Sequence, residues 1–271
     1  MNLSRREFLV MSGAGLIFPA KIQIEPQLSL EQLLEKARND SSIREEFVAQ
    51  LNAKYNSSNN QNFPHINEVI YSMSGNISAS HEDKALARAR KPNVVITNHF
   101  FECKPSDEYG VLEKNLEGYK EFFTGGELDL LKNLASSHLK SGSDDYVVKK
   151  EDDIVMILLH ENKHLEPFRR DAVVMFAYDI YPAIEEVMAH DHAFAEQKII
   201  GLNPSPNFID YVKLSYFGYY KMAKTLLLNE LQGVSLTDKP YPELQRLNSI
   251  LNNLNAIPRL TTEGINLEYK K

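Results

Sequence analysis

The residues best suited to chemistry form one short run, His160-Glu161-Asn162-Lys163-His164. Two histidines four positions apart lie on one face of a helix, about a turn from each other, so both imidazoles can reach the same metal ion. Glu161 lies between them on the same side, where it can accept a proton from a water that the ion has acidified. The pattern predicts metal-assisted hydrolysis, with Zn²⁺ as the cofactor and Glu161 as the catalytic base.

An apolar stretch, residues 154–159, leads directly into this run. The helical period places Ile157 on the same stripe as the two histidines and Glu161, whereas Asn162 and Lys163 point away. The motif is therefore expected on the buried side of its helix. The alternative is an ordinary amphipathic helix whose polar side chains are satisfied by neighbouring groups.

Residues 153–199 resemble the zincin metallopeptidases, whose signature is this H-E-x-x-H run. The resemblance implies a peptidase that acts on a peptide or protein substrate. It also implies a zincin-like domain in which a strand lies beside the active-site helix and can hold substrate backbone along its edge. In the gluzincin branch the third zinc ligand is a Glu on a following helix, within an E-x-x-A pattern that Glu186 begins here.

A catalytic zinc needs this third protein ligand and one position for water. Glu186 is the preferred candidate, and His190 stands where a second alignment to the family places its Glu. Because these two residues are four apart, they share a helix face, so one can bind the metal while the other supports it. The lesser candidates are Glu185, Asp191 and His192, and a solvated charged face is the alternative for each of them.

The N-terminal residues 4–9, Ser-Arg-Arg-Glu-Phe-Leu, resemble the twin-arginine export signal. The apolar residues 11–20 that follow suit such a signal and are too short to cross a bilayer as a helix. The resemblance implies export in the folded state to the periplasm or the medium. An uncleaved N-terminal segment would be the only membrane attachment, and a basic N-terminal arm is the alternative.

Composition narrows the choice of partners. The formal net charge of −7 argues against nucleic acid as a ligand. Cys103 is the only cysteine, which excludes an intrachain disulfide and a cysteine-rich zinc site. With 43% apolar residues the chain can build a substantial core. Nothing in the sequence specifies an oligomeric state.

The expected fold is α+β and mostly helical, with a small sheet. Capping boxes at Ser29 and Ser42 open helices that we expect to end near Asn39 and Tyr55. The polar residues 56–63 then form a linker. This divides the chain into a signal segment, a helical arm with its linker, and a zincin-like metal-binding domain, at residues 1–20, 21–63 and 64–271.

Within the metal-binding domain, β-branched and aromatic residues predict strands at 93–101 and 146–148. Helices are expected at 127–140, after Gly125-Gly126, and at 168–181, and the aromatic residues of the long segment 208–231 are expected in the core. Asp152 or Asp153 is expected to cap the motif helix, Pro167 to end it and Pro182 to open the Glu186 helix in its first turn. The second helix can then fold back over the first.

Two other functions fit part of the pattern. Residues 161–164 are also an E-x-x-H, as in ferritin-like di-iron bundles, but such a site needs a second copy and residues 185–196 contain none. A helical protein that stores metal or binds a partner is the third possibility. Its ion would be held by histidines 160, 164, 190 and 192.

Overall fold

The computed structural model describes residues 28–56, 63–72, 85–105, 116–117, 120–140, 146–166, 180–232, 249 and 256–269. These residues are mostly helical, with a three-stranded sheet and a two-stranded hairpin, which confirms the α+β prediction at that level. The predicted signal segment lies outside the described residues, as do most of the predicted linker and Pro167. The division of the chain at residue 63 stays a prediction.

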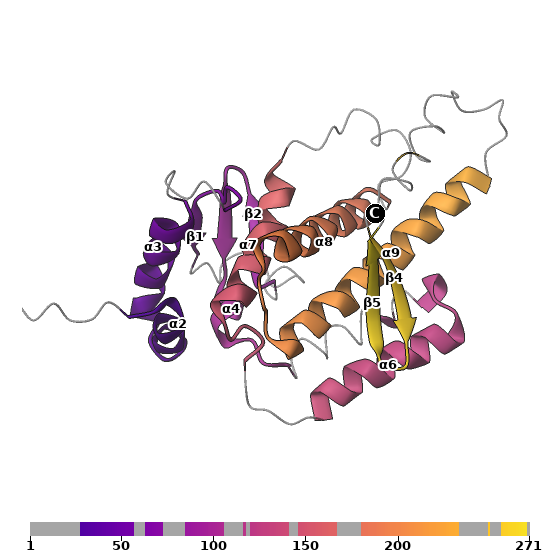
Figure 1. The fold of residues 1–271 in the computed structure, drawn as a ribbon, viewed down its shortest axis with the longest axis horizontal. Helices are drawn as coiled ribbons and strands as arrows, with labels where there is room; N and C mark the ends of the chain where they lie inside the picture. The colour runs from indigo at the N-terminus through magenta and orange to yellow at the C-terminus, as the bar shows by residue number, and fades with distance from the viewer. Residues whose placement is uncertain are drawn as a thin grey trace, which may run out of the picture.

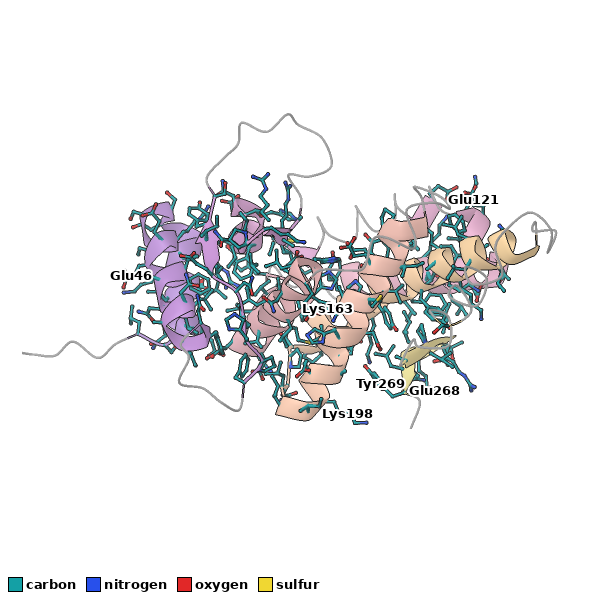
Figure 2. The ribbon with its side chains drawn as sticks, turned by 90° about the horizontal axis from the view of Figure 1, so that it is seen from above. Glu46, Glu121, Lys163, Lys198, Glu268 and Tyr269 are labelled. Atoms are coloured by element: carbon teal, nitrogen blue, oxygen red, sulfur yellow. The ribbon has the colours of Figure 1, made fainter. Side chains whose placement is uncertain are left out.

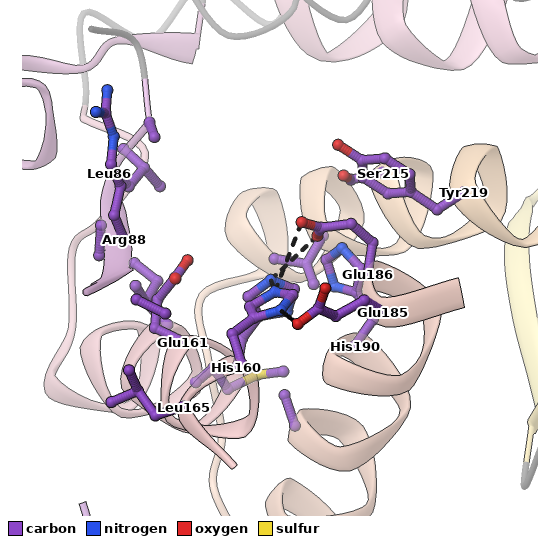
Figure 3. A pocket seen from close by; sticks show the side chains of 18 of the residues that line it. Leu86, Arg88, His160, Glu161, Leu165, Glu185, Glu186, His190, Ser215 and Tyr219 are labelled. Carbon is purple, nitrogen blue, oxygen red and sulfur yellow. Dashed lines mark hydrogen bonds and ion pairs between the residues drawn. The ribbon is translucent and has the colours of Figure 1, made fainter. Parts of the chain in front are cut away.

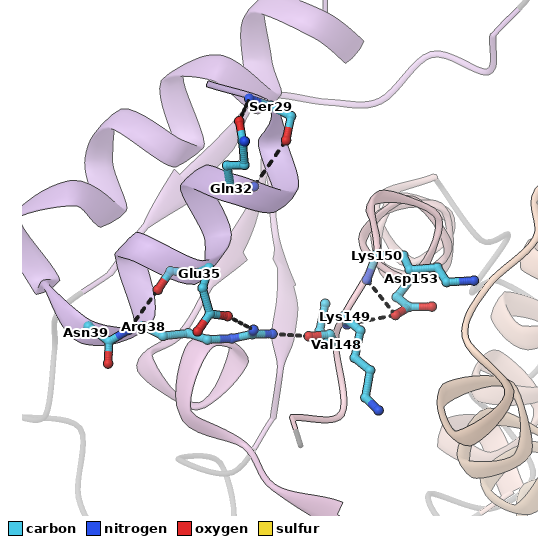
Figure 4. Close-up of polar contacts among 9 residues, drawn as sticks. All are labelled: Ser29, Gln32, Glu35, Arg38, Asn39, Val148, Lys149, Lys150 and Asp153. Carbon is cyan, nitrogen blue, oxygen red and sulfur yellow. Dashed lines mark hydrogen bonds and ion pairs between the residues drawn. The ribbon is translucent and has the colours of Figure 1, made fainter. Parts of the chain in front are cut away.

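Two helices begin the described chain, α2 (Leu30–Asn39) and α3 (Arg44–Tyr55). The capping box at Ser29 is confirmed, because its hydroxyl accepts from the Gln32 N–H and the Gln32 side chain accepts from the Ser29 N–H (Figure 4). The box predicted at Ser42 is wrong. The Asp40 carboxylate takes the Ser42 N–H and caps a 3₁₀ turn, η1 (Ser41–Ile43), from which α3 continues without a side-chain cap.

The sheet consists of β1 (Val69–Tyr71), β2 (Ala87–Arg90) and β3 (Asn93–Ile96), with β3 in the centre. Strand β1 runs parallel to β3 and β2 runs antiparallel to it. The predicted strand at 93–101 was too long, because the chain turns after Ile96 into a short helix, α4 (Asn98–Glu102). The aromatic residues that suggested a strand, Phe100 and Phe101, instead pack from this helix onto Phe47 of α3.

The strand predicted at 146–148 is also wrong. Val147 donates one backbone hydrogen bond to the Cys103 carbonyl, and the described sheets do not include it. Its neighbour Val148 accepts a hydrogen bond from Arg38 of α2 (Figure 4). These isolated bonds tie the segment to α2 and to the end of α4 just before the motif helix begins.

The motif helix and the helix of the third ligand are both present, as α7 (Glu151–Leu165) and α8 (Ile180–Ile200). The cap of α7 is Lys150 rather than Asp152 or Asp153, although the Asp153 carboxylate does accept the Lys149 and Lys150 N–H groups. Pro182 lies in the first turn of α8, as predicted. Of the helix predicted at 168–181, only the last two residues are described, and they begin α8.

The C-terminal half contains a 3₁₀ turn, a pair of helices and a hairpin: η3 (Lys120–Phe122), α6 (Gly125–Lys140), α9 (Pro206–Gln232), β4 (Ala256–Thr261) and β5 (Gly264–Tyr269). Helix α6 begins two residues earlier than predicted, at Gly125. Thr124 and Glu127, on either side of the two glycines, exchange capping hydrogen bonds and so include the glycines in the first turn. Helix α9 contains the long segment 208–231, and its aromatic residues Phe208, Tyr216 and Phe217 are buried, as expected for core residues. The hairpin was not predicted.

The elements follow one another along the molecule (Figure 1). Helices α2 and α3 lie at one end, then the sheet, then α7 and α8, then α9, with the hairpin and α6 at the other end. The view from above keeps this order, with Glu46 of α3 and Glu121 of η3 at opposite ends (Figure 2). One hydrophobic core runs from α2 through the sheet and α7 to α9. Among the described helices, none combines the length and apolar character that crossing a bilayer requires.

Candidate metal centre

Four predicted metal ligands meet where α7 packs against α8 (Figure 3). His160 and His164 come from α7, and Glu186 and His190 come from α8. Each pair is separated by one helical turn, so each helix presents both of its side chains on the face that meets the other helix. The two motif histidines and the two candidates for the third ligand, which the sequence placed on separate helices, therefore form one cluster.

Three of these side chains converge within the spacing of a metal site. The Nε2 atoms of His160 and His164 are 3.2 Å apart. The Glu186 carboxylate oxygens lie 3.3 Å from His160 Nε2 and 3.6 Å from His164 Nε2. Two ligands bound tetrahedrally at about 2.1 Å from one zinc would be about 3.4 Å apart. The separations are close to this value, although the two Glu186 distances end on different oxygens, Oε2 toward His160 and Oε1 toward His164.

His190 enlarges this cluster. One donor atom from each of His190, His160 and Glu186 lies within 4.8 Å of the others, a group that could hold a metal ion and that does not include His164. Within the part of the chain that the structure describes, the buried Nδ1 atoms of His160 and His190 have no hydrogen-bond partner. Buried polar atoms usually have a partner. The Nε2 atom of His160 faces the Glu186 carboxylate, and imidazole with carboxylate is a donor set suited to a cation.

The lesser candidates from the sequence occupy three different positions. The Glu185 carboxylate lies 3.6 Å from His164 Nδ1, on the far side of the ring from Nε2, where it can orient the imidazole. Asp191 is buried, and its charge helps burial to raise the pKa of Tyr216 on α9. His192 is half-buried and does not belong to the described group of converging donors.

Glu161 stands apart from the ligands, on the side of β2 (Figure 3). The Ala89 N–H of β2 donates a hydrogen bond to its carboxylate. Burial raises the pKa of Glu161 to about 8; the charge on His164 opposes this rise and the charge on Glu186 adds to it. A cation held by the neighbouring ligands would favour the carboxylate form and oppose the rise.

The pKa of Glu186 is shifted in the opposite direction from that of Glu161. Burial acts to raise the pKa of Glu186, but the hydrogen bond from His160 and the charges of the three histidines outweigh it and lower the pKa to about 2. Two carboxyl groups in one site thus have pKa values pushed far apart. Such a separation is typical of sites in which one group binds a charge and the other exchanges a proton.

A cavity of about 710 Å³ opens over the cluster. Strand β2 and the residues next to it form one wall, and one face of α9, with Tyr211, Ser215 and Tyr219, lines the other side (Figure 3). The sequence reasoning missed β2 because alanine is depleted in strands. The alternation of short and long side chains over residues 85–90 was the available signal.

Comparisons of the chain with protein-family models, curated proteins and solved structures give no match. The chemistry of the site therefore rests on its own residues. Two imidazoles and a carboxylate converge, a fourth donor lies beside them, and a second carboxyl group faces the same cavity. This arrangement can hold a cation and exchange a proton next to it.

Proposed function

We propose that the protein is a zinc-dependent hydrolase that cleaves peptide bonds. The observation that carries the proposal is the convergence of His160, His164 and Glu186 at separations of 3.2–3.6 Å, with Glu161 beside them. Two histidines and a glutamate are a ligand set that leaves one position of a tetrahedral zinc open. An open position separates a catalytic site from a structural one.

The donors suit zinc more than the other common cations. Imidazole with one carboxylate is the donor set of catalytic zinc, whereas Mg²⁺ and Ca²⁺ prefer oxygen ligands alone. The histidines also occupy the last two turns of α7, where the helix dipole favours positive charge. When bound, zinc lowers the pKa of water and polarises a carbonyl oxygen.

Glu161 is the proposed general base. Its carboxylate faces the cavity from the β2 side, and the hydrogen bond from the Ala89 N–H fixes its orientation. It accepts a proton from the attacking water and returns it to the leaving amine. Glu185 orients the His164 ring through Nδ1, so that Nε2 is directed at the ion.

The edge of β2 supports a peptide as the substrate. Leu86 accepts the Thr97 N–H, and backbone bonds alternate along an antiparallel pair. The backbone groups of Ala87 and Ala89 therefore point away from β3, consistent with the Ala89 bond to Glu161. An extended chain that pairs with Ala87 would lie along a wall of the cavity that the proposed metal ligands also line.

The di-iron alternative would make Glu161 a ligand. Glu161 instead faces β2, where its carboxylate accepts the Ala89 N–H (Figure 3). This favours the hydrolase over the di-iron bundle. We further propose export by the twin-arginine segment at residues 4–9, which would place the hydrolase in the periplasm or the medium and present it with extracellular peptides.

Zinc content and activity, measured together, distinguish a general base from a metal ligand. Purified protein should contain one zinc per chain by elemental analysis and should hydrolyse a mixed peptide library. Glu161→Gln should keep the zinc and lose activity about 10²- to 10⁴-fold, because an amide cannot accept the proton. Glu166→Gln, an exposed carboxylate at the end of α7, is the control and should match wild type. A wild-type protein without zinc under metal-replete conditions would contradict the proposal.

A further inference from the structure

His190 lies closer to the centre of the cluster than a supporting residue needs to be. Its ring centroid is 4.3 Å from that of His160, whereas the His164 ring is 4.9 Å from the same ring. It follows Glu186 by one turn of α8 and shares with His160 and Glu186 a group of donors within 4.8 Å. By position, His190 is as well placed as the motif histidine to reach an ion there.

The surroundings of His190 do not supply another role. Only 7% of the residue is exposed, and within the described residues its Nδ1 has no hydrogen-bond partner. The rings of Tyr216 and Tyr219 lie behind it, with centroids 5.7 Å and 6.1 Å away. A buried ring nitrogen without a partner is costly, and coordination through that nitrogen would satisfy it.

The number of protein donors decides whether a zinc site is open to water. A tetrahedral zinc with three protein ligands keeps one position for water, and one with four protein ligands is closed. We propose that His190 is a fourth, displaceable ligand, so that the metal site is closed at rest and opens when His190 leaves. The proposal rests on the hydrolase function and describes how that same site is regulated: water or substrate must compete with His190 for one position.

Cobalt substitution tests this without measuring activity. Co²⁺ replaces zinc in such sites, and its visible absorption changes when an added ligand enters the coordination shell. The probe ligand is azide, titrated into the Co²⁺ forms of wild type, His190→Ala, His190→Phe and His192→Ala. The Phe variant keeps a ring against Tyr216 in case the Ala variant folds poorly, and His192 is a half-buried histidine outside the donor group.

The expected result is a spectral change at low azide concentration for both His190 variants. Wild type and His192→Ala should need at least tenfold more azide, because His190 occupies the position. Equal azide affinity in all four proteins would overturn the proposal, and so would loss of cobalt from both His190 variants, since His190 would then be an obligatory ligand. Failure of wild type to bind any metal would instead contradict the hydrolase function itself.

Discussion

Each end of α7 carries a polar side chain with buried atoms on the same stripe, Asp153 at the start and His160 near the end. The hydrogen bonds of these two side chains differ. At the first end, Asp153 is fully buried and accepts four hydrogen bonds, from the N–H groups of Lys149, Lys150 and Ser205 and from the Ser205 hydroxyl. At the other end, the Nδ1 of His160 is buried without a partner among the described residues. We call the Asp153 end of α7 the saturated end and the His160 end the unsaturated end, because within the described part of the chain His160 pairs through Nε2 alone, with His164 and Glu186.

Helix physics explains why the two ends differ. The first turn of a helix has unpaired N–H groups and a partial positive charge, so a carboxylate such as Asp153 is stabilised there. The last turns carry a partial negative charge, which favours a cation near His160 and His164. The saturated end, at Asp153, also positions the neighbouring helices, because Ser205 lies between α8 and α9. Its bonds to Asp153 hold α7 in register with the helix that carries Glu186.

If zinc binds as proposed, the largest effect should come from removing it, because only the unsaturated end would depend on the ion. At free zinc of 100 to 1,000 times the dissociation constant, zinc binding adds about 3–4 kcal/mol to the free energy of unfolding. A chelator should remove this increment from wild type, measured as a lower melting temperature. His160→Ala should melt near the apo wild type and show no response to the chelator. A chelator-sensitive His160→Ala would mean that the stabilising ion binds elsewhere.

Replacement of Asp153 should act on the saturated end alone. Asp153→Ala leaves buried donors unpaired and should lower the free energy of unfolding by about 3 kcal/mol in urea titrations. Asp152→Ala is the control, since the Asp152 carboxylate accepts one bond, from the Asn203 N–H, and should lose about 1 kcal/mol. Because Asp153 is about 10 Å along the helix from His160, the zinc increment should remain. Loss of the increment in Asp153→Ala would show that the two ends are coupled.

The sequence predicted the unsaturated end better than the saturated one. The spacing of His160 and His164 on one helix face is a local property that the sequence shows, and the resemblance to the zincins pointed to Glu186 on the next helix. The fold brings these three side chains together. Asp153 was expected only as a cap. Its bonds to Ser205 join residues far apart in the chain, which local pattern cannot show.

The strands were predicted less well for a related reason. Phe100 and Phe101 have the residue types of a strand, yet their packing against Phe47 of α3 is better made from a helix. Conversely, β2 has poor strand composition and is a strand because it pairs with β3 and lies against α7. In both places tertiary contacts outweighed local propensity, and one of them borders the proposed active site.

The smallest effect should come from Asn162, which lies inside the metal motif but is saturated. Its amide donates to the His65 carbonyl and its oxygen accepts the Asn67 N–H, so it ties the segment before β1 to α7. Asn162→Ala should lower the free energy of unfolding by about 1 kcal/mol and leave zinc stoichiometry unchanged. Lys163→Ala, which removes an ion pair with the exposed Glu166, should change stability by less than about 0.5 kcal/mol. If Asn162→Ala abolished zinc binding while the protein stayed folded, position within the motif, rather than saturation of hydrogen bonds, would decide which residues serve the metal.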